Sequence, residues 1–378
     1  MLCKKLLSKQ FTLIVLGAAL LTMGKVSAQA LRIPQNTNFT SSVGRTVGTT
    51  NIEIKYSSPG VKGREGKIWG TDIAPYGFTV LGYGSNVQSP WRAGADECTT
   101  ISFSTDVKIN GKALSAGKYA LFIAVYADSC TLIFNRNTDA WGSYFYRADL
   151  DVLRVKTIQQ KNQPNLQERL IYSFANQTAE SVEVALEWER WKIPFKVEVD
   201  LKKTTLADIR RQMSGAIGFD PASLEAAATW CLMNDTNYEE ALNWIISASD
   251  PNLGGVNGFR TLSTKSKLLE KLGKTSEASK IWNEAIEKAS TMELHAYGRQ
   301  LLAQKKTKEA MAIFESNYKK SNGAWPTNAG MMRGLSATGD LKKALEHAKM
   351  ALTQAPDETN KKFIESAIKQ LEAGQALN

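Results

Sequence analysis

Side chains that could do chemistry gather between Lys62 and Thr100, a glycine-rich segment with the composition of a loop. Carboxylates there could act as a general acid or base. Indole and guanidinium groups could grip a sugar or a peptide through ring faces and charged hydrogen bonds. Together with a second polar segment near residue 140, the candidate ligand-binding residues are Arg64, Lys67, Trp69, Trp91, Arg92, Asp96, Glu97, Asp139, Trp141 and Tyr144.

The carboxylates support hydrolysis only weakly. Asp96 and Glu97 are adjacent, and adjacent residues on a strand point to opposite faces, so they could not flank one scissile bond. One of them, or Asp139, could still act alone, which keeps a glycan-active hydrolase as an alternative. In a third interpretation Arg92 and Asp96, with Arg64 or Lys67, form charge-assisted hydrogen bonds that only fasten the loop to a sheet.

Other site chemistries lack their motifs. Gly60 and Gly66 are one residue too far apart for a phosphate loop, and Ile68 stands in the Ser/Thr place. The sequence Gly82-Tyr83-Gly84-Ser85 does not complete a nucleophile elbow, and no histidine lies before residue 201 to serve as base. We therefore expect a binding protein more than an enzyme.

Cysteine and histidine usage argues against a metal site or a cofactor. CxxC pairs are absent, and the two histidines, His295 and His347, fall in different predicted helices. A disulfide between Cys98 and Cys130 is conceivable in an exported protein. The favoured interpretation is that these thiols are small buried apolar groups.

The first residues predict export. Lys4, Lys5 and Lys9 precede an apolar run from Phe11 to Leu21, and Val26-Ser27-Ala28 offers small residues for a peptidase. We expect a signal peptide over residues 1–28, cleavage near Ala28, and a periplasmic or secreted mature chain without a transmembrane segment.

The charge of the mature chain predicts no nucleic-acid partner. Removal of the four lysines in residues 1–28 lowers the net charge from +10 to +6. Lysine and arginine are interspersed with aspartate and glutamate throughout, whereas nucleic-acid binding requires a clustered basic surface.

Residues 29–200 have the pattern of strands. Asn51–Ser57 alternates apolar and polar residues, as a half-buried strand does. Lys118–Tyr126 is apolar on both faces, as expected of a central strand. Asn110-Gly111 suits a tight hairpin turn, and Val182–Val199 predicts a longer hairpin that turns near Arg190. These short strands predict an antiparallel β-sandwich or an open barrel.

Residues 201–378 have a helical period and an internal repeat. The alanines of four similar segments, Ala241, Ala278, Ala310 and Ala344, are 37, 32 and 34 residues apart. That spacing is close to the period of about 34 of tetratricopeptide repeats. Gly298 stands where such a repeat places its packing glycine. We expect an all-α, tetratricopeptide-like solenoid whose surface docks a protein partner.

The β region resembles a known family through a series of ordered motifs. The similarity covers about Leu31 to Asp200 and is carried by Pro59–Arg64, Lys67–Gly70, Pro75–Gly77, Trp91–Glu97, Ile109–Lys112, Ala116–Tyr119 and Asp139–Gly142. These resemble the domain of unknown function 2911. The resemblance implies an exported bacterial protein, in some members with helical repeats behind the β domain, and carries over no catalytic residue.

Two features depart from the family pattern. Phe78–Pro90 separates the Pro-Tyr-Gly motif from Trp91-Arg92, where members usually have a short connection. Ala93 and Asp96 stand where members more often have a hydroxyl residue and an asparagine. The extra charge at Asp96 disfavours an anionic ligand there.

The leading hypothesis is an exported binding protein in two domains, residues 29–200 and 201–378. The β domain would recognise a glycan or a peptide at the Trp/Arg loop cluster, and the helical repeats would dock a protein partner. The alternatives are the hydrolase that uses Asp96, Glu97 or Asp139 and a purely structural envelope protein.

Overall fold

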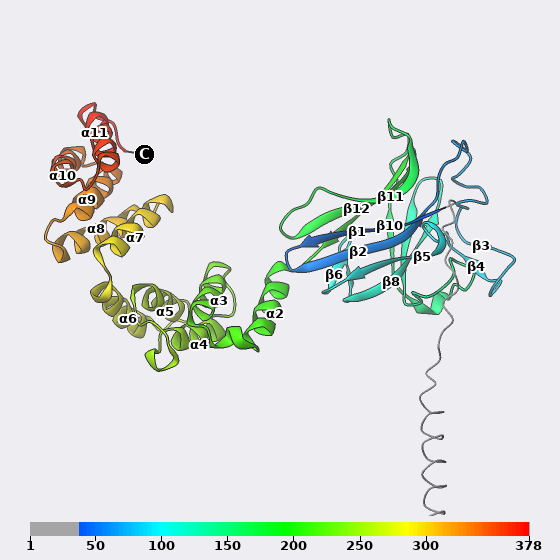
Figure 1. Ribbon diagram of the computed structural model, residues 1–378, viewed down its shortest axis with the longest axis horizontal. Helices are drawn as coiled ribbons and strands as arrows, with labels where there is room; N and C mark the ends of the chain where they lie inside the picture. The colour runs from blue at the N-terminus through cyan, green and yellow to red at the C-terminus, as the bar shows by residue number, and fades with distance from the viewer. Residues whose placement is uncertain (1–37, 378) are drawn as a thin grey trace, which may run out of the picture. The chain divides into compact units, whose positions relative to one another are not determined.

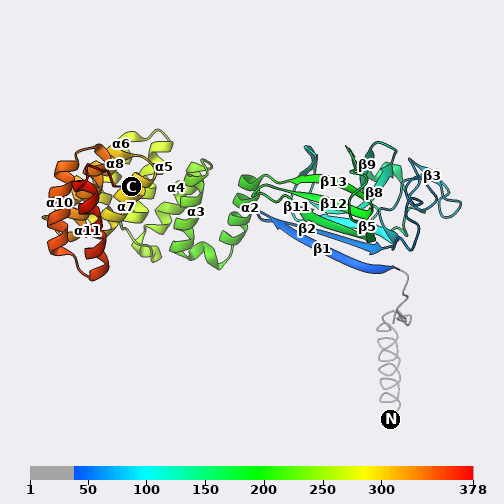
Figure 2. The ribbon, with the colours of Figure 1, turned by 90° about the horizontal axis from the view of Figure 1, so that it is seen from above.

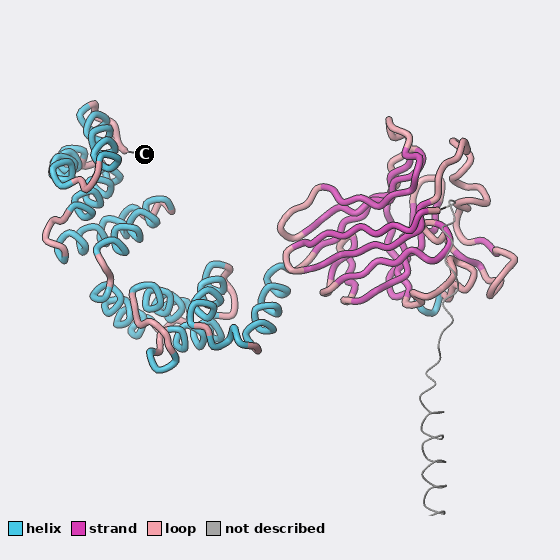
Figure 3. The backbone as a smooth tube through the Cα atoms, in the orientation of Figure 1, coloured by secondary structure: helices cyan, strands magenta, loops and turns pink. Residues whose placement is uncertain are grey.

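The computed structural model describes residues 38–377, and the chain divides into two compact units (Figure 3). The first ends at Val199 and consists of strands; the second begins at Asp200 and consists of helices. This confirms the predicted fold class. The proposed signal peptide lies outside the described residues. No helix within residues 38–377 is long and apolar enough to cross a membrane.

Two antiparallel sheets form the β unit (Figures 1 and 2). The first contains, in spatial order, β1 (Phe39–Val47), β2 (Thr50–Ser58), β5 (Ala95–Phe103), β8 (Gly117–Val125), β9 (Cys130–Asn135) and β10 (Asp151–Thr157). The second contains β11 (Gln167–Ala175), β12 (Ser181–Glu189), β13 (Trp191–Glu198), β6 (Val107–Ile109) and β7 (Lys112–Leu114). A small hairpin, β3 (Thr79–Val80) and β4 (Gln88–Ser89), lies in the Phe78–Pro90 segment.

One apolar core lies between the two sheets, so the unit is a sandwich and not an open barrel. Tyr119, Leu121 and Ile123 of β8 belong to this core, together with residues of β11, β12 and β13. Alternate residues of β8 pack on the other face of the sheet, beneath Ala140 and Tyr146. A short 3-10 turn, η1 (Ala148–Leu150), follows this covering loop. The double coverage explains why β8 is apolar on both faces.

Local chemistry sets the turns. Asn110 and Gly111, between β6 and β7, have φ angles of 46° and 80°, the positive values of the predicted tight turn. The hairpin of β12 and β13 brings Trp188 opposite Trp191, which confirms the turn at Arg190.

Ten α-helices follow in the described part of the second unit. They are α2 (Leu201–Met213), α3 (Pro221–Met233), α4 (Tyr238–Ala248), α5 (Phe259–Lys271), α6 (Thr275–Lys288), α7 (Thr291–Ala303), α8 (Thr307–Lys320), α9 (Trp325–Thr338), α10 (Leu341–Gln354) and α11 (Glu358–Glu372). Two 3-10 turns, η2 (Ala216–Phe219) and η3 (Pro251–Leu253), separate some of them. Side-chain oxygens of Asp220, Ser290 and Asp357 cap the N-termini of α3, α7 and α11.

The repeat alanines are buried in the second helix of each pair, on α4, α6, α8 and α10. Phe314 fills the space between α7, α8 and α9. A Cβ built on Gly298 would lie 2.3 Å from its ring, and one on Gly330 would lie 2.6 Å away. These glycines therefore allow the close approach of helices that the sequence predicted at Gly298.

Cys98, Cys130 and Cys231 are all buried free thiols. Cys98 belongs to the apolar cluster on the outer face of the first sheet, whereas Cys130 belongs to the core between the sheets. Because the two thiols lie in clusters on different faces, the conceivable Cys98–Cys130 disulfide is wrong, and the thiols act as apolar packing groups.

Candidate functional site

Four tryptophans form a packed group at one end of the sandwich, which we call the Trp69 cluster. Trp91 stacks on Trp188 with ring centroids 6.0 Å apart, and Trp69 stacks on Trp191 at 4.6 Å. Trp69 also meets Trp91 edge-on at 5.5 Å. Trp188 is fully buried and Trp91 is 5% exposed. The indole faces that could have held a ligand therefore pack largely against one another.

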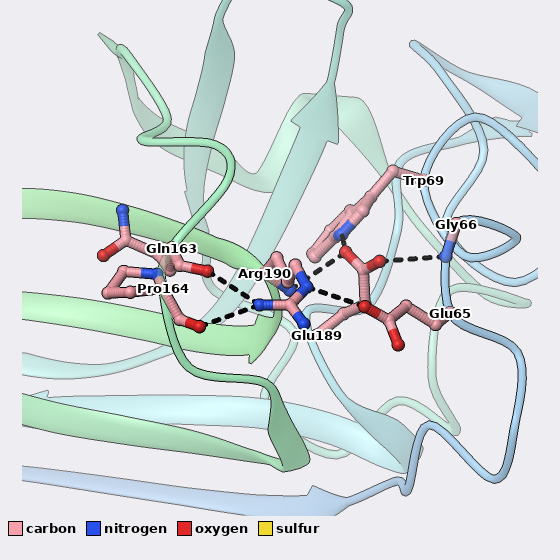
Figure 4. Close-up of polar contacts among 7 residues, drawn as sticks. All are labelled: Glu65, Gly66, Trp69, Gln163, Pro164, Glu189 and Arg190. Carbon is pink, nitrogen blue, oxygen red and sulfur yellow. Dashed lines mark hydrogen bonds and ion pairs between the residues drawn. The ribbon is translucent and has the colours of Figure 1, made fainter.

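A buried carboxylate ties this cluster to the loop (Figure 4). Glu189, which is 6% exposed, accepts hydrogen bonds from the backbone N–H of Gly66 at 2.9 Å and from the Trp69 indole at 3.1 Å. The N–H of Arg190 donates to the same carboxylate at 3.0 Å. Glu189 has a φ of 56°, a value that costs energy for a residue with a side chain. We call Glu189, Gly66 and Trp69 the Glu189 clamp.

Arg190 extends the attachment on the solvent side. Its guanidinium contacts the Glu65 carboxylate at 2.6 Å and donates to the carbonyls of Gln163 and Pro164 (Figure 4). This one side chain therefore joins the loop before Trp69 to the connection between β10 and β11.

Arg64 and Lys67 belong to the same loop. The Arg64 guanidinium donates to the carbonyls of Val61 and Gly60 at 2.9 and 2.7 Å and so closes the turn around Gly63. Lys67 is exposed. Arg64 thus has a local structural role, while Lys67 is available to a ligand.

Arg92 lies beside a different group of residues. Its guanidinium donates to the Asp96 carbonyl at 2.9 Å and lies 5.0 Å from the centre of the Tyr144 ring. A Cβ on Gly142, whose φ is 55°, would come within 2.6 Å of the guanidinium. A side chain at this position would displace the guanidinium of Arg92 and strain the backbone, which favours glycine after Trp141.

The three candidate carboxylates have different hydrogen-bond partners. Both oxygens of Asp96 accept from the amide of Asn38, at 3.2 and 3.0 Å. Glu97 is exposed and accepts from Ser57, whereas Asp139 is exposed and contacts Thr138. Each carboxylate thus has its own neighbour, which does not favour paired acid and base chemistry.

The Phe78–Pro90 segment adds an aromatic residue that the sequence had not marked. Tyr83 lies edge-on to Tyr144, with ring centroids 6.3 Å apart, and the N–H of Ser85 donates to the Tyr144 carbonyl. Tyr83 is 74% exposed and Trp141 is 53% exposed. We call Tyr83, Arg92, Trp141 and Tyr144 the aromatic rim; it is separate from the Trp69 cluster.

The helical unit contains a groove of about 1340 Å³ that sequence analysis did not locate. It is lined by one face each of α3, α5, α6, α7 and α8, and its lining includes Thr229, Ser263, Lys267, Ser279, Ala296 and Gln300. The residues of α7 that line the groove are three or four positions apart and so share one face of the helix. This spacing, added to the repeat pattern, is the sequence signal that could have located the groove.

Three aromatic side chains of the groove lining pack against one another. Phe259, Trp282 and Tyr297, from α5, α6 and α7, lie with ring centroids 5.6 to 6.3 Å apart. The Lys267 ammonium lies 4.7 Å from the centre of the Tyr297 ring, and burial lowers the pKa of this lysine. The described residues offer no group of three or more side chains suited to a metal ion.

The order of motifs in the β unit agrees with a family comparison. Residues 39–197 match the family described as protein of unknown function (DUF2911). The β unit is a DUF2911 domain. This confirms the resemblance inferred from the motifs, and DUF2911 covers the Glu189 clamp and the aromatic rim but not the helical groove.

Two solved structures have a remote similarity to part of the chain. One titled MamA 41-end from Desulfovibrio magneticus RS-1 has 16% sequence identity and a TM-score of 0.23, over 42% of this chain and 95% of that one. The MamA RS-1 ArsTM double mutant has the same identity and TM-score, over 42% of this chain and 96% of its own. No curated protein matches the chain.

Proposed function

We propose that the chain is an exported binding protein whose helical unit holds an extended segment of a partner protein. The observation that carries the proposal is the groove of about 1340 Å³ along five helices. A groove of this volume suits a peptide better than a compact small molecule, because its lining is spread along successive helices.

The chemistry of the lining supports a peptide occupant. The side-chain amides of Asn283, Gln300 and Gln304 line the groove and form no hydrogen bond with another residue of the described chain. An amide can donate and accept at once, which is what an extended peptide backbone requires of its surroundings. Trp282 and Tyr297 add rigid apolar surface between them.

The aromatic rim of the β unit supports a second surface, for a glycan. Tyr83 and Trp141 are both more than half exposed; Tyr83 lies edge-on to Tyr144, and Arg92 lies over the Tyr144 ring. Exposed rings stack on the apolar faces of sugars, while guanidinium and carboxylate groups bind their hydroxyls. If a peptide competes with the glycan at Trp141, the aromatic rim is a peptide-binding surface and not a glycan-binding one.

The hydrolase and purely structural alternatives receive less support. The carboxylates of Asp96, Glu97 and Asp139 each accept a hydrogen bond from a different neighbour and not from a shared one. The Glu189 clamp does have a structural role, since it fastens the loop. The groove and the exposed rim are not explained by that role.

Filling the groove tests the proposal. Ala296 is exposed on α7 and lines the groove, so Ala296→Trp should block a peptide without disturbing the core. Ala373→Trp, at an exposed position after α11, is the matched control. After crosslinking in intact cells, we expect Ala296→Trp to lose at least about tenfold of the partner recovered with the mature chain. Equal recovery with Ala296→Trp would contradict the proposal, provided that circular dichroism shows both variants folded.

A further inference from the structure

Arg299 and Arg333 lie near each other on neighbouring helices of the second unit. His295 of α7 packs on α9, where its Nδ1 lies 3.3 Å from a Cβ built on Gly330. One turn further along each helix are Arg299 and Arg333. Because residues three or four apart lie on one face of a helix, this packing places both arginines on the facing sides of α7 and α9, near enough for the charge of Arg299 to act on Arg333.

Arg333 is held in a setting that costs energy. It is half-buried, and its Nε has no hydrogen-bond acceptor among residues 38–377. Its guanidinium lies 4.5 Å from the centre of the Phe363 ring of α11. Burial, and then the charge of Arg299, lower the pKa of Arg333. A desolvated cation beside a second cation is unfavourable unless an anion accompanies it.

The described chain does not supply that anion. No carboxylate of residues 38–377 lies within ion-pair distance of Arg299 or Arg333. Arg333 is the one charged residue in the sequence of α9. The one carboxylate in the sequence of α7, Glu293, caps the helix through Ser290.

We propose that Arg299 and Arg333 bind a carboxylate of an acidic segment in the partner protein. The inference rests on the proposed function and adds a contact outside the groove lining, to which neither arginine belongs, together with the chemical class of the partner's segment. Guanidinium groups present paired N–H donors that match a planar carboxylate, and the Phe363 ring supports one guanidinium plane. A phosphate group shares part of this chemistry, so it is a separate arm of the test.

The test titrates the full mature chain with synthetic hexaglutamate, with hexalysine and inorganic phosphate as comparisons. The variants are Arg299→Gln and Arg333→Met; the control is Arg211→Gln, an exposed arginine of α2 paired with Asp208. We expect hexaglutamate to bind, to weaken as salt rises, and to lose about tenfold or more in affinity with each variant. Unchanged affinity in both variants would overturn the site, and tighter binding of phosphate would overturn its assignment to a carboxylate.

Thermal stability gives a second readout, independent of any partner. Arg333→Met keeps an apolar stem over Phe363 and removes the unpaired charge, so we expect it to raise the melting temperature of the unliganded chain by about 2 to 4 °C. A lower melting temperature would show that the arginine is needed for folding and would overturn the proposal. If Arg299→Gln and Arg333→Met keep their affinity for hexaglutamate while partner recovery still depends on Ala296, this inference fails and the proposed function stands.

Discussion

The indole N–H of Trp69 donates to the buried carboxylate of Glu189, 120 positions later in the sequence, at 3.1 Å. Through this contact a loop that carries the DUF2911 motifs is fixed to the hairpin of β12 and β13. The tryptophans of that loop thus serve first to close the end of the sandwich.

Glu189→Gln should therefore weaken the β unit. The amide leaves one acceptor for three N–H donors and turns its own N–H₂ toward some of them. We expect the free energy of unfolding to fall by about 2 kcal/mol, measured by urea denaturation with tryptophan fluorescence. Glu180→Gln, at an exposed position, should change it by less than about 0.5 kcal/mol. A loss of less than about 0.5 kcal/mol in Glu189→Gln would contradict the stabilising role of the Glu189 clamp.

Trp91 and Trp141 are both candidate ligand-binding residues, but their removal should affect stability differently because one is buried and the other is exposed. Trp91→Ala removes a ring that is 5% exposed and stacked on Trp188, and should cost about 3 to 5 kcal/mol. Trp141→Ala removes a ring that is 53% exposed and should change stability by about 0.5 kcal/mol or less. Glycan-array binding by Trp141→Ala that equals the wild type would remove the support for the aromatic rim.

Gly298→Ala tests the packing of the repeats. A methyl group there would lie 2.3 Å from the Phe314 ring, so the gain in helix propensity, about 1 kcal/mol, should be outweighed by crowding of about 1 to 3 kcal/mol. We expect a net loss of stability by circular dichroism at 222 nm. Gly374→Ala, beyond α11, is the comparison without crowding, since no neighbour lies within 4 Å of its Cβ; any loss of stability there comes from its φ of 72°. A clear gain in stability at Gly298 would show that α7 and α8 are less closely packed.

Acid should destabilise the helical unit through His295. Burial, and then the charges of Arg333 and Arg299, lower the pKa of His295 from 6.5 to about 4. Between these values the unfolded chain binds the proton and the folded chain does not, so stability falls as pH drops from 6.5 to 4, by up to about 3 kcal/mol. His295→Gln should remove most of this dependence, whereas His347→Gln should remove a smaller part, because burial also lowers the pKa of His347. A dependence unchanged in His295→Gln would contradict a buried neutral imidazole.

The fold was largely predictable because its patterns are local. Alternation marked the hairpin of β12 and β13, and the repeated alanines marked the second helix of each pair. Asn110-Gly111 identified its turn because the required backbone angles are rare for other residues. The order of the short motifs along the β region was enough to indicate DUF2911, because each motif is a run of neighbouring residues.

The candidate site was less predictable because it depends on contacts distant in sequence. Glu189 looks like one of several alternating glutamates of a surface strand, and only the fold places it beneath Trp69. Tyr83 lies in an insertion that no periodicity describes. The predicted single patch instead divides into the Trp69 cluster and the aromatic rim, because Trp91 packs in the core while Arg92 lies against Tyr144.

The central claim, that the helical groove holds a segment of a partner, is tested most directly by a photo-crosslinking residue at Gln300. This position is exposed and lines the groove, whereas Lys319 on α8 is exposed and lies outside the lining. We predict that Gln300 crosslinks in intact cells to one defined segment of one protein, sequenced by mass spectrometry, and that Lys319 does not. Crosslinks that are absent at Gln300, or identical from both positions, would contradict the account.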